Sequence, residues 1–66
     1  MIYNFHLVRT DNIRQINTPE LYKLLDGAEN AVGRMAGDRS HIMDMKVAAE
    51  KITLLINELE RRGENI

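Results

Sequence analysis

Residues 42–59, IMDMKVAAEKITLLINEL, carry apolar side chains at alternating intervals of three and four positions. This spacing places the side chains on one face of an α-helix, the face that a helix turns toward a core. The members of this face are Ile42, Met45, Ala49, Ile52, Ile56 and Leu59, with Ala48 and Leu55 widening it on one side. The pattern predicts a helix over residues 40–62, which Gly63 ends.

A second apolar face is expected on the same helix. Met43, Val47 and Leu54 fall on a different side from the main face. A chain of 66 residues is near the lower limit at which a single core holds a fold unaided, so we do not expect it to cover both faces. These three residues are therefore predicted to contact another protein molecule, either a second copy or a different partner.

Another helix is predicted over residues 19–36. Thr18 supplies a capping hydroxyl, Pro19 suits the first helical position, and Glu20 is an acid at the positive helix end. Gly37 is expected to end this helix, with Asp38 or Ser40 capping the next one. The short connection makes the two helices antiparallel neighbours. The side chains expected to close this hairpin are Leu21, Leu24, Leu25, Ala28, Val32 and Met35 against Ala49, Ile52, Ile56 and Leu59.

Residues 2–9 alternate in polarity, which predicts a short β-strand followed by a linker over residues 10–18. The alternating side chains are Tyr3, Phe5 and Leu7 on one side and Asn4 and His6 on the other. One strand alone has no stability in water. It must pair with its copy in a dimer, extend the sheet of a partner, or lie on the helices as an extended arm. Tyr3 and Phe5 therefore join the predicted interface.

Composition excludes several classes of function. The chain has no cysteine, so it has neither disulfides nor thiolate zinc sites. A net charge of −1 gives no strong attraction to nucleic acid or to an anionic membrane. No apolar run approaches the roughly 18 residues that span a bilayer, and the start lacks the layout of a secretory signal. We expect a cytoplasmic protein.

Candidates for chemistry are few. Ser40 and His41 are sequence neighbours and cannot face one another on a helix, so no nucleophile and base pair is predicted. Asp38, His41 and Asp44 are spaced by three, but the set lacks a second histidine or a thiolate, and we predict no metal site. We also predict no cofactor and no enzymatic activity. The pairs Lys46–Glu50 and Glu58–Arg62 are four apart, as expected for a solvated helix face.

These patterns together predict a mostly α fold: one small domain, residues 1–66, in which an antiparallel two-helix hairpin follows a short N-terminal strand or extended arm. We expect it to form a homodimer and to act as an accessory or regulatory protein–protein interaction module. The alternative is a DNA-binding regulator that resembles the ribbon–helix–helix repressors in layout. In that case two paired strands would enter the major groove, and Asn4, His6 and Arg9 would read bases. The long connection after the strand, the long helices and the slightly acidic charge argue against the alternative.

Overall fold

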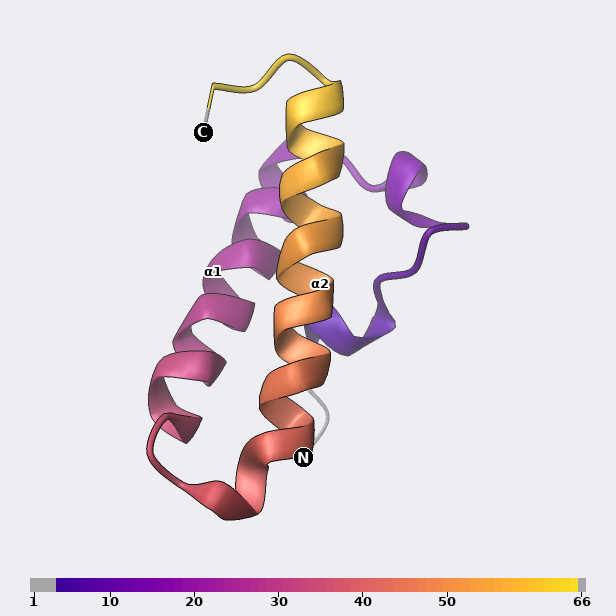
Figure 1. Ribbon diagram of the computed structural model, residues 1–66. Coiled ribbons are helices and arrows are strands. Elements are labelled where there is room, and N and C mark those ends of the chain that lie inside the picture. Colours follow the sequence, from indigo (N-terminus) through magenta and orange to yellow (C-terminus); the bar gives the residue numbers. More distant parts are fainter. Residues whose placement is uncertain (1–3, 66) are drawn as a thin grey trace.

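The computed structural model describes residues 4–65, and the side chains of residues 5–65. Two long helices, α1 (Thr18–Met35) and α2 (Ile42–Arg61), run antiparallel and pack side by side (Figure 1). The turn between them contains the short 3-10 helix η3 (Arg39–His41). The predicted helical hairpin is therefore confirmed.

The helix ends follow local signals, with two corrections. The cap of α1 is Asn17, whose side chain accepts a hydrogen bond of 2.9 Å from the backbone N–H of Glu20. The prediction that Thr18 caps this helix is wrong, because Thr18 is already helical and its hydroxyl accepts a hydrogen bond from Arg62. Gly37 ends α1 with φ of +88°, a left-handed conformation that favours glycine. The prediction that Asp38 or Ser40 caps the second long helix is wrong, because Asp38 caps the short η3 and α2 begins after His41, whose side chain makes no capping hydrogen bond.

Residues 4–16, here called the N-terminal segment, contain two short 3-10 helices, η1 (Asn4–Leu7) and η2 (Ile13–Gln15). The predicted β-strand is wrong over residues 4–9, and residues 2 and 3 lie outside the described part. A 3-10 turn brings positions three apart onto one side, so Phe5 and Val8 both enter the core, each 1% exposed. Alternation along a strand would have placed them on opposite faces.

The N-terminal segment packs against both helices and completes the core (Figure 1). Its buried residues join an interior that both helices share. The buried apolar side chains are Phe5, Val8 and Ile13 of the segment, Leu21, Leu24, Leu25, Ala28, Ala31 and Met35 of α1, and Ala48, Leu55 and Leu59 of α2. The expectation that the chain could not supply a second packing surface for α2 overlooked this segment.

The buried face of α2 is rotated from the one that the sequence predicts. Ala49 is exposed and Ile56 only half-buried, whereas Ala48 and Leu55 are fully buried. The reason is that α2 is covered from two sides, by α1 and by the N-terminal segment. Burial is therefore deepest between the two, which is where Ala48 and Leu55 lie.

Candidate functional site

Two cationic side chains, Lys51 of α2 and Arg62 directly after this helix, hold the N-terminal segment by its backbone. The Lys51 ammonium donates to the carbonyl oxygen of Val8 at 2.6 Å. Arg62 donates to the carbonyl oxygens of Ile13 at 3.1 Å and of Arg14 at 3.3 Å. These hydrogen bonds fix the position of the segment on α2, and the segment forms one wall of each of two grooves.

Glu58 organises the arginines at this end of α2. Its side chain is 5% exposed and accepts hydrogen bonds from Arg61 at 2.9 and 2.6 Å and from Arg62 at 2.7 Å. These hydrogen bonds hold the pKa of the Glu58 carboxyl at about 2, below its ordinary value of 4.5. The prediction of a solvated Glu58–Arg62 pair is wrong, because the side chains of Glu58 and Arg62 are only 5% and 16% exposed.

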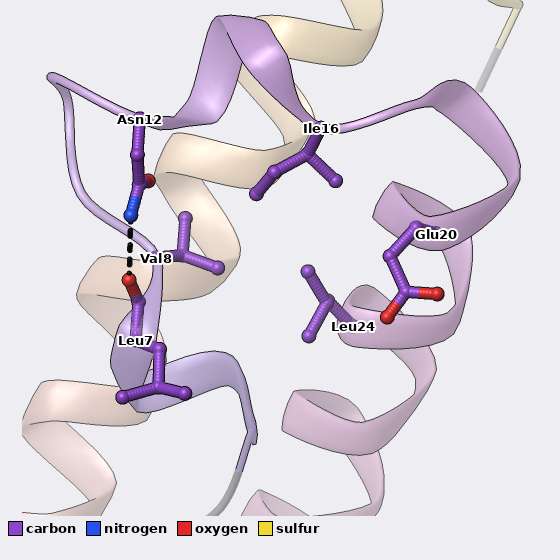
Figure 2. Close-up of a pocket in the computed structure, with 6 residues that line it drawn as sticks. All are labelled: Leu7, Val8, Asn12, Ile16, Glu20 and Leu24. Atoms are coloured by element: carbon purple, nitrogen blue, oxygen red, sulfur yellow. Dashed lines mark hydrogen bonds between the residues drawn. The ribbon is translucent and has the colours of Figure 1, made fainter.

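A first groove lies between the N-terminal segment and α1 (Figure 2). It is open to solvent, has a volume of about 290 Å³ and is walled mainly by aliphatic side chains. Asn12 shapes one wall, because its side chain donates to the carbonyl oxygen of Leu7 and accepts from the N–H of Arg9, both at 2.9 Å. The lining residues are Leu7, Val8, Asn12, Ile16, Glu20 and Leu24.

A second groove lies between the same segment and α2, and it has a different chemistry. Its volume is about 240 Å³. Two apolar side chains share the lining with hydroxyl, amide, guanidinium and carboxylate groups. The lining residues are Thr10, Ile13, Arg14, Leu54, Asn57, Glu58 and Arg61.

The residues predicted to contact a partner do not form one exposed surface. Met43 is 69% exposed near the start of α2, whereas Val47 and Leu54 are half-buried. Leu54 packs against the core and lines the second groove. Phe5 is buried inside the chain's own core, so it can reach a partner only if the segment moves. Tyr3 lies outside the described residues.

The ribbon–helix–helix layout requires an extended strand at the N-terminus. Residues 4–9 instead form η1 and an irregular stretch. His6 is half-buried with its ring edge-on to Phe5, and Arg9 pairs with Asp11 at 3.2 Å. The side chain of Asn4 lies outside the described part.

The polar residues at the hairpin turn form a cluster on the surface. The His41 ring lies 3.5 Å from Asp38 and 3.4 Å from Asp44, and the Ser40 hydroxyl donates to Asp38 at 2.7 Å. The Asp38 pKa is lowered, chiefly by this hydroxyl and by the N–H of Ser40. Within residues 4–65, no group of three or more histidine, cysteine or acidic side chains is arranged to hold a metal ion.

The buried glutamate is the site residue that sequence reasoning missed. Its position carried a signal, because Glu58 falls between Leu55 and Leu59 and has arginines three and four positions later. An acid in an apolar register with two such neighbours is placed to pair with both of them. The contacts of Lys51 and Arg62 with the N-terminal segment had no comparable signal in the sequence, since the groups that accept these hydrogen bonds are backbone carbonyls.

Comparisons with protein-family models, curated proteins and solved structures find no match to this chain. Neither of the described long helices has an apolar stretch sufficient to cross a membrane.

Proposed function

We propose that this protein is a non-enzymatic protein-binding module, and that the first groove receives apolar side chains of a partner segment. The observation that carries the proposal is the exposure of Leu7, 66%, at the edge of an open groove whose walls are mainly aliphatic. A volume of about 290 Å³ is at the lower end for ligand pockets, and it suits one or two side chains of a docked segment.

The occupant that we propose is an amphipathic helix of another protein, with a lysine or arginine beside its apolar side chains. Among the described residues, Glu20 is the only charged one that lines the groove, and it is exposed. Its carboxylate would favour a cation at that end of the docked helix. In helix-in-groove recognition, apolar side chains three or four positions apart on the docked helix enter the groove. Here they would contact the N-terminal segment on one side and α1 on the other.

A different protein is favoured over a second copy. Self-association was expected because α2 had an uncovered face and the N-terminal strand had no partner. Leu54 on α2 packs against the core beside the N-terminal segment, and residues 4–9 contain no strand that needs pairing. An accessory or regulatory role in the cytoplasm would suit such a module. Whether the protein instead forms a homodimer through this groove is tested below by sedimentation.

The test uses a phage-displayed library of amphipathic helical peptides, selected against the intact protein. We expect the enriched peptides to carry apolar residues three or four apart with a nearby lysine or arginine. Leu7→Asp should weaken their binding at least about tenfold, because it places a charge at the groove edge. Met43→Asp is the matched control, since Met43 is equally exposed but lies outside the groove.

Two results would contradict the proposal. One is equal binding of the selected peptides to wild type and to Leu7→Asp, or a larger loss from Met43→Asp. The other is a dimer in sedimentation of the wild-type protein that Leu7→Asp dissociates, which would assign the groove to a second copy. Glu20→Gln should reduce the preference for basic peptides, whereas Glu29→Gln, an exposed change elsewhere on α1, should not.

A further inference from the structure

We infer that the second groove, between the N-terminal segment and α2, binds a carboxylate carried on a short apolar body. Polar residues from both walls line it: Arg14 and Thr10 from the segment, and Asn57 and Arg61 from α2. All four carry N–H or O–H donors. Within the described residues, the side chains of Thr10, Arg14 and Asn57 make no hydrogen bond, so they keep their capacity for a ligand.

The charge of the groove favours an anion. Glu58 is the one acid among the described residues of its lining, and both its oxygens already accept hydrogen bonds from Arg61 or Arg62. Arg61 uses its Nε and one terminal nitrogen on Glu58, which leaves Nη1 without a partner among the described residues. Arg14 adds an unpaired guanidinium. Guanidinium groups bind carboxylates through strong, directional hydrogen bonds, which makes an organic acid a suitable ligand.

The apolar part of the groove distinguishes such an acid from a bare inorganic anion. Ile13 and Leu54 line it between the two arginine-bearing walls. A fully hydrated ion would leave this aliphatic surface uncovered, whereas an apolar body of a few carbons would bury it. This site is independent of the proposed function, because it lies against α2 and shares no lining residue with the first groove.

The experiment is a titration of the intact protein followed by ¹H–¹⁵N and methyl nuclear magnetic resonance, with isocaproate as the probe. We expect saturable shifts at the Arg14 and Arg61 side chains and at the Leu54 methyl groups, with a dissociation constant on the order of 1 mM. Isocaproamide has the same body without the charge and should bind at least about tenfold more weakly. Inorganic phosphate should shift the arginine signals without saturating in the same range.

Arg14→Gln is the informative variant, because Arg14 is exposed and its side chain has no structural partner among the described residues. It should weaken isocaproate about tenfold and leave the fold unchanged, whereas Arg39→Gln, an exposed arginine in the hairpin turn, should have no effect. Equal binding of acid and amide, equal binding to Arg14→Gln, or tighter binding of phosphate than of isocaproate would each overturn the assignment. A capped leucyl-glutamate dipeptide distinguishes the sources: tighter binding than isocaproate assigns the site to an acidic peptide side chain, and weaker binding assigns it to a free organic acid.

Discussion

The guanidinium group of Arg62 donates a 3.1 Å hydrogen bond to the carbonyl oxygen of Ile13, although the two residues are 49 positions apart. The same side chain donates to the Thr18 hydroxyl at 3.1 Å and to Glu58 at 2.7 Å. Arg62 thereby joins the end of α2 to the start of α1 and to the N-terminal segment. A chain without disulfides gains in this way a polar tie at the end of its hairpin.

Arg62→Met tests the contribution of this tie to stability. The change keeps the aliphatic stem but removes charged donors from two carbonyl oxygens and from Glu58. We expect a loss of about 2 kcal/mol in the free energy of unfolding, measured by urea denaturation. Arg34→Met changes an exposed arginine of α1 and should stay within about 0.5 kcal/mol of wild type. Equal effects of the two changes would mean that the Arg62 contacts do not stabilise the fold.

The acid end of the stability profile should depend on Glu58. Its pKa is about 2 in the folded chain against an ordinary 4.5, because Arg61 and Arg62 donate to it. Because folding lowers the pKa of Glu58, its ionised carboxylate stabilises the folded protein above pH 4.5. This contribution is lost as the pH falls from 4.5 toward 2.

The difference in unfolding free energy between wild type and Glu58→Gln should therefore become smaller as the pH falls through that range. Asp38→Asn controls for the other acid with a lowered pKa, at the hairpin turn. A difference between wild type and Glu58→Gln that stays constant from pH 7 to pH 2 would contradict the assignment.

Lys51→Met should loosen the N-terminal segment without unfolding the helices. The Lys51 ammonium lies 2.6 Å from the Val8 carbonyl oxygen, and its loss leaves the centre of the segment without that hydrogen bond. We expect amide hydrogen exchange to become roughly tenfold faster over residues 8–14 and to stay unchanged in α1. Lys46→Met, at an exposed position of α2, should leave both regions as in wild type. Unchanged exchange in residues 8–14 of the Lys51 variant would refute this role.

Substitutions by glutamate on α2 discriminate the observed burial from the predicted one. The sequence pattern placed Ala49 in the core and Leu54 on a free surface, whereas Ala49 is exposed and Leu54 packs against the core. Leu54→Glu should cost about 2 kcal/mol of unfolding free energy, and Ala49→Glu less than about 0.5 kcal/mol. The reverse order in thermal or urea denaturation would favour the original prediction.

Local signals sufficed to predict the hairpin. Pro19 and Glu20 mark the start of α1, and Gly37 and Gly63, with φ of +88° and +85°, mark where the two helices stop. These signals depend only on near neighbours in the chain. Helical periodicity likewise predicted most of the buried face of α1, including Leu21 and Ala28.

Tertiary packing decided what the sequence pattern could not predict. The alternation of Tyr3, Phe5 and Leu7 favoured a strand, but Phe5 and Val8 enter the core together from a 3-10 turn. The choice of turn over strand depends on helices distant in sequence, which offer an apolar surface and no sheet edge. The same segment packs against α2, whose buried face differs from the predicted one, so the missing strand and the changed burial on α2 have one origin.

The central claim is that the N-terminal segment is part of the core of a single chain, and two alanine substitutions in η1 test it most directly. Phe5 is 1% exposed and Leu7 is 66% exposed, two positions away. In urea denaturation we expect Phe5→Ala to lower the free energy of unfolding by about 3 kcal/mol and Leu7→Ala to change it by less than about 0.5 kcal/mol. Equal small effects of the two substitutions would contradict the claim, because they would mean that the segment does not pack into the core.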